Sequence, residues 1–594
     1  MVGAVVRGSR KARRPGESGR HQRGHPPGGY ASVAWPRGWV AHLLLAVLPA
    51  LVFANALPAQ FVWDDFDLVV NNVLLRIPGG FVQIFQTDPF GFPLSLGQYY
   101  RPIQTVTFWI QYRLHGLDPM PYHLFNVGLH VVDVLLLFSF LLRLGLRRPL
   151  AFLASLAFGL HPLAVECVTF IAVRGDLLLL FFALLALHSL LFVVRGRHGS
   201  AWVVGIVLSV ALALITKESA VVVPVLLVLT AWTLRPVPRR VWIGVSAAFA
   251  VTVAYVVVRA TLHLSAVAPA VLSNIAYATP YERVLTVCRV VATDLRLLLV
   301  PYDLHIEYQF VERSLGSPWV FVGAPLAILF LAFLWWRAAK VDRPLAFYFL
   351  GWFVVGIGPF FQIVPLAQTM AERWLYIPSV GFLSLLVLAG ASVPPQWRRS
   401  ATVLFVVWVA ALGVQTHLRN RDWRDNETLF GGDLVLASDS FLVPHNYGVV
   451  LFQKGDYAAA QELFETSIAR APGGGYGTAH NSLGAVLEVL GDLEGAEREF
   501  ARSIRLSRYA LAFSGRGRVL TRLGRPQEAI GVLQDGLRSY PRNPDILYSL
   551  GDAYAALGQW SEAAAAWERI PPGIPGLGDI QGRIREAKRR AGAR

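Results

Sequence analysis

The chain has 594 residues, of which 55% are hydrophobic and only 15% charged, and its formal net charge is +16. A soluble globular protein carries about 25% charged residues, so this composition excludes a purely soluble chain. Its hydrophobicity also excludes disorder over most of the length, because disordered segments are poor in apolar residues. Two cysteines, Cys167 and Cys288, are too few for a disulfide scaffold, and without a Cys/His cluster they do not predict a structural zinc site.

Charge is distributed unevenly and divides the chain into three parts. Residues 1–38 hold eight basic residues and one acidic residue without apolar periodicity, which predicts a disordered basic cytoplasmic tail. Residues 39–416 hold 40 charged residues and the shorter segment 417–594 holds 43, so the main domain boundary lies near residue 417. The positive charges of the middle part stand in short clusters between apolar runs. This pattern indicates membrane topology, and we expect no nucleic-acid partner.

Eleven apolar runs predict a polytopic helical membrane domain over residues 39–416, and with it an all-α fold. The first run extends from Trp39 to about Pro58, close to the roughly 20 residues that cross a bilayer core. Ala54-Asn55-Ala56 leaves a cleaved signal peptide as the alternative interpretation of this run. The other ten runs centre on residues 122–142, 149–165, 176–194, 201–216, 219–234, 241–260, 318–337, 346–365, 375–391 and 400–416.

Basic clusters follow every second run and set the predicted topology. After the basic tail they stand near Arg143, Arg195, Arg235, Arg337 and Arg398. All of them fall on one side of the membrane if the N-terminus is cytoplasmic, and the opposite side then receives the loop 59–121 and everything after residue 416. The apolar but charged segments 102–114 and 284–301 are expected to be amphipathic helices at that outer surface. We therefore expect a multi-pass protein of the inner or plasma membrane with a periplasmic C-terminal part.

A repeat of about 34 residues follows the membrane domain and is marked by glycines. Gly455, Gly491, Gly524 and Gly558 are 36, 33 and 34 residues apart. In the same register, glycines stand at 448, 484, 517 and 551 and large residues at 464, 500, 533 and 567. The pattern resembles the tetratricopeptide repeat (TPR) and predicts an array over 441–575, with a linker and leading helix over 417–440 and a basic tail over 576–594. Because such arrays bind peptides or proteins on a concave face, we expect a protein partner there.

Charged side chains at the outer ends of the runs are the candidate site residues, because a charge within a membrane is costly unless it faces a cavity. Asp64 and Asp65 follow the first run directly. A carboxylate beside a membrane surface can act as a general base, and an acidic loop that only assists topology is the alternative. An arginine beside a carboxylate can hold a phosphate, with a plain loop ion pair as the alternative. The remaining candidates are His161, Glu166, Arg174, Asp176, Lys217, Glu218, Glu372 and Arg373.

Five segments occur in order ahead of the repeats: YYRPIQTVTFWIQY, YHLFNVGLH, FGLHPLAVECVTFIAVRGD, TKES and AERWLYIPSVGF. This ordered set resembles the transmembrane and tetratricopeptide-repeat-containing family of protein O-mannosyltransferases and its bacterial relatives, over roughly residues 40–570. That family is similar in turn to the GT-C superfamily of polytopic glycosyltransferases. The resemblance implies a GT-C-like helix bundle that moves a sugar such as mannose from a polyprenyl-phosphate donor to a hydroxyl of a protein acceptor on the extracytoplasmic side.

The resemblance also implies a role for the acidic pair. Asp64-Asp65 matches the pair in the first outer loop of GT-C enzymes, and Asp64 is the member assigned as the base. No metal is required by this interpretation, because a polyprenyl phosphate is already a good leaving group. A divalent metal held by Asp64 and Asp65 stays open, since carboxylate oxygens are the ligands that such ions prefer.

Two further motifs match the family. They are an RxD motif at Arg174 and Asp176 and an AER motif that includes Glu372 and Arg373. By this resemblance, Arg174 or Arg373 stabilises the departing phosphate in the transition state.

A non-catalytic membrane scaffold is the alternative function. Its TPR array would recruit periplasmic or polysaccharide-assembly proteins. The charged set at the outer surface favours the enzyme, because a scaffold does not need Asp64, Arg174 and Glu372 together on one face.

Overall fold

The computed structural model describes residues 38–90, 94, 99–196, 199–262, 273–571 and 578–592. The predicted basic tail lies outside these residues except for Gly38, and the predicted C-terminal tail is described in part. The described residues form helices joined by turns and loops, and the β-type pairing among them is one antiparallel bridge between Tyr308 and Met370. The expected all-α fold is confirmed.

Eight of the described helical segments are long and apolar enough to cross a membrane: Gly38–Ala56, Pro119–Leu144, Ile171–Val194, Arg239–Thr261, Trp319–Ala339, Arg343–Phe360, Glu372–Gly390 and Pro395–Trp423. A bent pair, Arg148–Gly159 and Pro162–Val168, meets the same test as one span with an angle of 53°. Two shorter apolar helices, Ser200–Leu214 and Glu218–Thr233, complete the set. Each predicted run thus corresponds to an apolar helix of a multi-pass membrane protein, although two of these helices are shorter than a full span.

Helix α4 (Pro119–Leu144) shows how the sequence sets the ends of a span. The Asp118 carboxylate caps its start by accepting a hydrogen bond from the Met120 N–H at 3.1 Å, and Pro119 occupies the first turn, where no N–H is needed. Gly145 ends the helix with a φ of 109°, which glycine adopts without strain. At about 1.5 Å per residue the helix is long enough to cross the roughly 30 Å hydrocarbon core.

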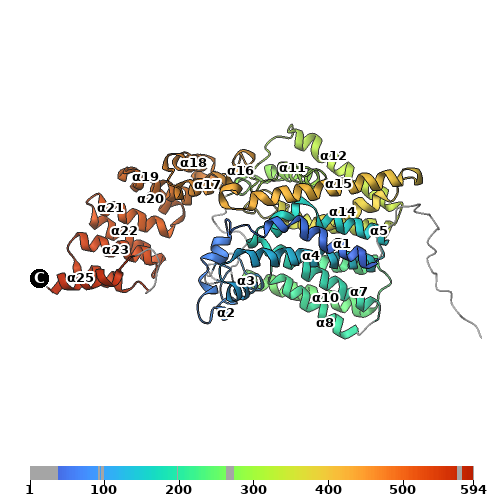
Figure 1. Cartoon of the computed structure of the whole chain (residues 1–594), viewed down its shortest axis with the longest axis horizontal. Coiled ribbons are helices and arrows are strands. Elements are labelled where there is room, and N and C mark those ends of the chain that lie inside the picture. The colour runs from blue at the N-terminus through green and yellow to red at the C-terminus, as the bar shows by residue number, and fades with distance from the viewer. Residues whose placement is uncertain are drawn as a thin grey trace, which may run out of the picture. The chain divides into compact units, whose positions relative to one another are not determined.

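The bundle is built from helices that pack along one another (Figure 1). Helix α1 (Gly38–Val52) packs on α4, α4 packs on α7 (Arg174–Val194), and α13 (Arg343–Ile357) packs on α14 (Tyr376–Gly390). The last pair comes close because Gly381 has no side chain. A Cβ at that position would lie 2.6 Å from the Phe349 O and 2.7 Å from the Phe353 N. Small residues permit such close helix packing within a membrane.

Short elements join the long helices at the end of the bundle where the candidate residues lie. The first connection holds η2, η3, α2 and α3, at Phe66–Val70, Val73–Leu75, Gly80–Gln83 and Pro102–His115, and Figure 1 shows α2 and α3 at one end of the bundle. Other connections hold η4, α6, η5, η6 and η10, at Pro162–Ala164, Val165–Val168, Ile171–Val173, Glu218–Val222 and Glu372–Leu375. Helix α11 (Pro280–Leu299) covers most of the segment predicted at 284–301.

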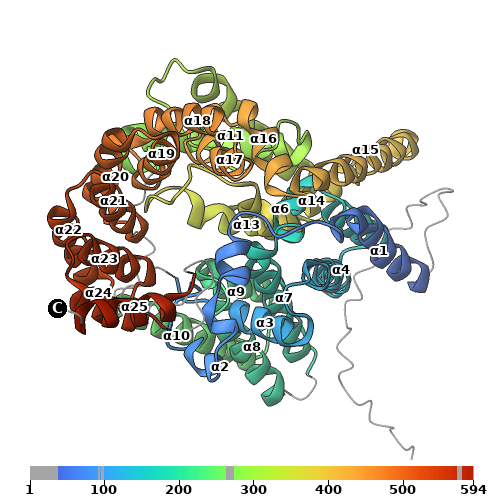
Figure 2. The same cartoon turned by 60° about the vertical axis from the view of Figure 1, so that its left-hand side comes forward.

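The C-terminal part is a row of paired antiparallel helices that follow one another in Figure 2. The pairs are α17 with α18 (Leu442–Gln453, Tyr457–Arg470), α19 with α20 (Gly477–Leu490, Leu493–Ser507), α21 with α22 (Ala510–Arg522, Pro526–Ser539) and α23 with α24 (Pro544–Ala556, Trp560–Glu568). Helix α25 (Ile580–Gly592) packs on α24. One core of buried side chains joins the pairs from α20 to α24, and a separate cluster joins α18 to α19, as expected for stacked repeats.

Glycine determines how closely the two helices of each pair approach. A Cβ at Gly448 would lie 2.7 Å from the Phe464 ring. In the other three pairs, an added Cβ would lie similarly close to a side chain of the facing helix. The distances are 3.0 Å from Gly484 to Phe500, 2.6 Å from Gly517 to Leu533 and 2.2 Å from Gly551 to Trp567. The turns inside the pairs use left-handed glycines with φ between 72° and 90°, at Gly455, Gly491, Gly524 and Gly558. The predicted repeat register is confirmed.

Helices also connect the bundle to the array. Helix α15 (Arg398–Arg419) continues through η12 (Asn420–Trp423) to α16 (Asn426–Leu436), in the segment predicted as linker and leading helix. Asp425 caps α16, because its carboxylate accepts the Thr428 N–H at 2.8 Å while the Thr428 hydroxyl accepts the Asp425 N–H at 3.3 Å. Residues 437–441 alone separate α16 from α17.

Candidate active site

The connection after the first span turns sharply at Trp63 and separates the two members of the acidic pair. Trp63 has a φ of 47°, a conformation that costs a residue other than glycine roughly 1–3 kcal/mol. Its N–H donates to the Asn426 Oδ1 at 2.9 Å, and its ring stacks on Phe170 at 5.6 Å. The turn is therefore held from two sides, and it directs Asp64 and Asp65 into different surroundings.

Asp65 is a fully buried structural carboxylate. Its Oδ2 accepts the Val62 N–H at 3.0 Å and its Oδ1 accepts the Ala172 N–H at 2.7 Å. Burial raises the pKa of Asp65 well above its ordinary range, and the two backbone donors oppose that rise. Through these two hydrogen bonds Asp65 ties the first connection to η5.

Asp64 is half-buried, and its carboxylate has no hydrogen-bond donor among the described residues. Burial raises the pKa of Asp64 to about 6, and the negative charge of Asp67 adds to this rise. The positive charges of Arg373 and Arg101 act in the opposite direction. A carboxylate with a pKa near neutral and no internal donor is suited to accept a proton from a substrate.

A small pocket opens between the start of α7, η6 and the ends of α13 and α14. It is lined by Asp176, Ser219, Val222, Gly356, Phe360, Arg373, Trp374 and Ile377. Trp374 stacks on Phe360 with ring centroids 4.8 Å apart, and the two rings form an aromatic part of the lining. The pocket thus combines an apolar surface with Asp176 and Arg373, two of the residues predicted from the sequence.

Arg373 is held in place by Glu166. The Glu166 Oε2 accepts the Arg373 backbone N–H at 2.8 Å, and its Oε1 forms an ion pair with the guanidinium. The side chain of Glu166 is 1% exposed, whereas that of Arg373 is 19% exposed. The guanidinium is therefore anchored from behind and still reaches the pocket, where it also acts electrostatically on Asp64 and Asp176.

Lys217 and Glu218 take two different partners. Lys217 forms an ion pair with Asp176 at the pocket wall. The Glu218 carboxylate accepts hydrogen bonds from Arg101 at 2.8 Å and from Arg259 at 3.2 Å. Glu218 thereby joins the start of η6 to the residue that precedes α3 and to the last turn of α10 (Arg239–Thr261).

Arg174 does not reach the pocket. Its guanidinium is fully buried and donates to the Asn126 Oδ1 at 2.7 Å, the Thr107 hydroxyl at 3.0 Å and the Tyr122 O at 3.1 Å. The rings of Phe108 and Phe125 cover it at 4.6 and 4.5 Å. None of these partners lines the pocket, so the position of Arg174 does not support the expectation that it contacts the donor phosphate there. It joins α3 and α4 to α7 instead.

His161 also lies away from the pocket. Its Nδ1 accepts the Leu163 N–H at 3.3 Å and so caps η4, and its Nε2 lies 3.1 Å from the Leu298 O. The ring is 2% exposed and packs edge-on against Trp408. His161 thus forms a buried contact between η4 and α11, and this position does not support the expectation that it contacts substrate at the pocket.

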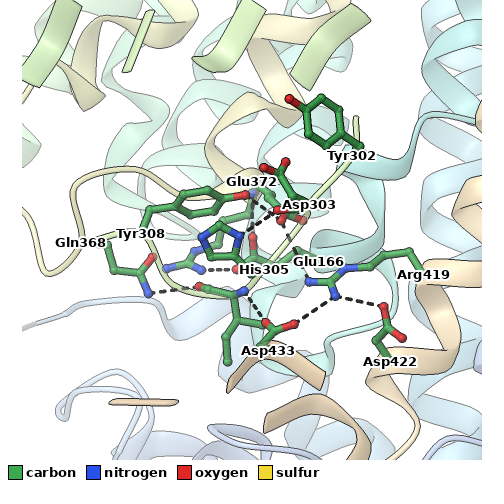
Figure 3. A network of polar contacts seen from close by, with 12 residues as sticks. Glu166, Tyr302, Asp303, His305, Tyr308, Gln368, Glu372, Arg419, Asp422 and Asp433 are labelled. Carbon is green, nitrogen blue, oxygen red and sulfur yellow. Dashed lines mark hydrogen bonds and ion pairs between the residues drawn. The ribbon is translucent and has the colours of Figure 1, made fainter. Parts of the chain in front are cut away.

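Glu372 is adjacent to Arg373 in the sequence but points the other way. Figure 3 shows it within a network in which it accepts a hydrogen bond from the Tyr308 hydroxyl at 3.1 Å and lies 4.0 Å from the Arg419 guanidinium. Arg419 in turn pairs with Asp422 at 3.0 Å and Asp433 at 3.3 Å. Of the predicted AER pair, only Arg373 lines the pocket.

Sequence reasoning missed several charged members of this end of the bundle. Arg101 stands in the quoted motif YYRPIQTVTFWIQY, and Arg259 stands at the outer end of the run 241–260, so both positions carried a signal. No sequence signal marked Tyr308 or Arg419, because a tyrosine in a long loop and an arginine at the end of a span are common. Their role depends on which segments meet in space.

Among the described residues, no group of three or more His, Cys, Asp or Glu side chains gathers as metal ligands would. Asp65 has both oxygens bound to backbone N–H groups, which leaves Asp64 as the one member of the pair with unengaged oxygens.

Fold and site together define a helical membrane bundle with a charged pocket at one end and a C-terminal repeat array. Residues 448–510 and 515–575 match the family model for the tetratricopeptide repeat. Among solved structures, the chain is similar to ArnT from Cupriavidus metallidurans bound to undecaprenyl phosphate (16% identity, 78% of this chain and 80% of that one, TM-score 0.35). It is also similar to YrrB, a TPR protein with an unusual peptide-binding site (21% identity, 32% and 91%, TM-score 0.23).

Relatives of known name match about 70% of the chain. It is 25% identical to protein O-mannosyl-transferase F38B6.6 of Caenorhabditis elegans over 446 residues, which cover 72% of this chain and 62% of the relative. It is 27% identical to TMTC3 of Mus musculus over 71% of this chain and 50% of the relative, and 26% identical to TMTC4 of Homo sapiens over 72% and 66%. The resemblance to this family is confirmed, and the matches span half to two thirds of the length of these relatives.

Proposed function

We propose that this chain is a membrane glycosyltransferase that moves mannose from a polyprenyl-phosphate donor to a hydroxyl group of a protein acceptor on the extracytoplasmic side. The observation that carries the proposal is the Asp64 carboxylate. It has no hydrogen-bond donor among the described residues, its pKa is raised to about 6, and it acts electrostatically on Arg373 of the pocket. The names of the relatives support transfer to protein hydroxyl groups and the choice of mannose.

The proposed reaction is one displacement at the anomeric carbon of the sugar. Asp64 accepts the proton of a serine or threonine hydroxyl, and the oxygen forms a bond to the anomeric carbon. The bond between that carbon and the phosphate oxygen breaks, and its electron pair leaves with the polyprenyl phosphate. The base and the cation therefore act on opposite sides of the sugar. This requires Asp64 and Arg373 to lie near each other without forming a direct ion pair.

Arg373 and Lys217 are the proposed phosphate ligands, in place of the deeply buried Arg174. Glu166 and Asp176 pair with their charges, so the protein itself holds the two cations in position without a net excess of charge. A phosphate that enters needs no reorganisation of these groups, and preorganised cations stabilise charge that develops on the leaving group. The apolar wall of Phe360 and Trp374 suits the adjoining lipid chain.

We propose further that the reaction needs no divalent metal and that the array binds the acceptor. The arrangement of Asp65 supports the first point, since both of its oxygens are engaged. The second point is supported by the TPR match and by the short helical connection that leads from α15 through η12 and α16 to the first repeat.

The test is transfer by the purified full-length protein in liposomes. Radiolabelled mannosyl phosphoryl polyprenol is the donor, glucosyl phosphoryl polyprenol is the matched control, and a serine- and threonine-rich protein is the acceptor. We expect label in the protein with the first donor and much less with the second. If neither donor labels the acceptor, while the array still binds proteins, the scaffold interpretation holds and the enzyme proposal is wrong.

A further inference from the structure

The segment from Tyr302 to Glu312 lies between the AER turn and the helices that lead into the array. Figure 3 shows part of it in contact with both sides. On the array side, Asp433 of α16 accepts the Ile306 backbone N–H on its Oδ2 at 2.7 Å. The same carboxylate binds the Arg419 guanidinium through its Oδ1 at 3.3 Å, and it is 1% exposed. One buried side chain thus joins α16, the end of α15 and the segment.

The next residue extends this contact into the first repeat. Glu307 is fully buried, and its Oε2 accepts a hydrogen bond from the Ser440 hydroxyl and the Leu442 N–H at 3.3 Å. Its Oε1 accepts the Gln309 side-chain amide at 2.8 Å. A carboxylate at the first N–H groups of a helix is favourable for that helix, so Glu307 stabilises the start of α17.

The other edge of the segment lies against the residues that precede Arg373. The Thr369 N–H donates to the Tyr308 O at 2.9 Å, and the Thr369 hydroxyl donates to the Phe310 O at 2.9 Å. The Tyr308 hydroxyl donates to Glu372 at 3.1 Å. Ile306 and Glu307 are therefore bound on the array side of the segment, and Tyr308 is bound to the AER turn.

We propose that Asp433 and Tyr308 are positioning residues, which let the start of the repeat array set the position of the turn that carries Arg373. The contacts form an unbroken series from Asp433 through the segment 306–310 to Glu372 and Arg373. Buried carboxylates hold hydrogen-bonded partners tightly, because an unpaired partner is costly. The catalytic consequence rests on the proposed function of Arg373, whereas the positioning itself does not.

Hydrogen–deuterium exchange on the full chain in nanodiscs tests the positioning directly. Tyr308→Phe removes one hydroxyl and keeps the ring, and Asp433→Asn removes the charge that holds Arg419. We expect exchange over residues 369–376 to become roughly tenfold faster in each, as loss of a buried hydrogen bond predicts. The matched control is Asp422→Asn, because Asp422 binds the same arginine but is 45% exposed and does not contact the segment. Exchange over 369–376 in the control should stay at the wild-type rate.

The proposal is wrong if the Tyr308→Phe variant is folded and inserted and its exchange over residues 369–376 is unchanged. This variant alone decides the test if Asp433→Asn fails to fold. A second readout separates the proposal from the function on which its consequence rests. We expect kcat for a short soluble peptide to fall about tenfold in Tyr308→Phe while the KM for the peptide is unchanged, since Arg373 acts on the leaving group. Faster exchange with an unchanged kcat would support the positioning and overturn the catalytic role of Arg373.

Discussion

Arg373 binds the carboxylate of Glu166 twice, through its backbone N–H at 2.8 Å and through its guanidinium. The double contact fixes both the turn and the side chain, so the cation is presented to the pocket in one orientation. Arg174, which matches the family motif equally well in sequence, is instead enclosed by Phe108 and Phe125. These two arginines have different surroundings, and they should respond differently to the same substitution.

Arg373→Lys is expected to reduce turnover and Arg174→Lys to reduce stability. Lysine keeps the charge beside Glu166 but loses the fork that binds a phosphate, so kcat should fall about 10²-fold with little change in the unfolding temperature. At position 174 lysine leaves buried acceptors without donors, at about 1–3 kcal/mol each. Thermal unfolding in detergent and initial rates measure the two effects. Equal loss of stability in both variants would contradict the assignment of Arg373 to the pocket.

Asp64→Asn is expected to abolish transfer while the protein remains in the membrane. An amide cannot accept the acceptor's proton, and a general base contributes typically about 10²–10⁴-fold. Asp67→Asn is the matched control, because Asp67 is three residues away and exposed. Initial rates at saturating donor measure the effect. Turnover above a third of the wild-type rate in Asp64→Asn would remove Asp64 as the base.

The pH dependence of transfer should follow the ionisation of Asp64. The base acts only when ionised, and its pKa is about 6, so kcat/KM should fall as the pH drops through this value and level off above about 7. Because the charge of Asp67 raises the pKa of Asp64, Asp67→Asn should move the acidic limb to lower pH. Rate profiles of the two proteins measure the shift. A shift to higher pH in Asp67→Asn would be inconsistent with this electrostatic relationship.

Much of this architecture could be predicted from local sequence signals. Apolar runs depend on composition alone and repeat glycines on spacing alone, so the helices and the facing pair Gly448–Phe464 followed from the sequence. The site could be predicted from the sequence less completely than the fold. Whether Arg174 or Arg373 faces the pocket depends on which helices meet, and the rotation that turns Glu372 toward Tyr308 is a property of one short turn. No local signal marked Tyr308, because its partner lies 64 residues away.

Chelation should not affect transfer. Asp65 keeps both oxygens on backbone N–H groups, so Asp64 acts without a shared ion in this proposal. Transfer rates in an excess of EDTA should therefore stay within about twofold of the untreated rate, as for a leaving group that needs no Lewis acid. Added magnesium after chelation is the control. Loss of activity with EDTA and its recovery with magnesium would show that an ion takes part.

Removing the later repeats should separate acceptor binding from chemistry. A truncation after Tyr476 keeps α16, α17 and α18, and with them the contacts of Asp433 and Glu307, but removes the helices from Gly477 onward. If the array holds an extended acceptor near the pocket, it raises the local concentration of each hydroxyl at Asp64, and that advantage disappears on truncation. We expect the KM for a protein acceptor to rise about tenfold or more, while transfer to a short soluble peptide keeps its rate.

Donor hydrolysis in the absence of acceptor serves as the control for an intact pocket. If the truncated protein is folded and inserted, and glycosylates the full protein acceptor as fast as the intact chain, then the array does not bind the acceptor and serves a different partner.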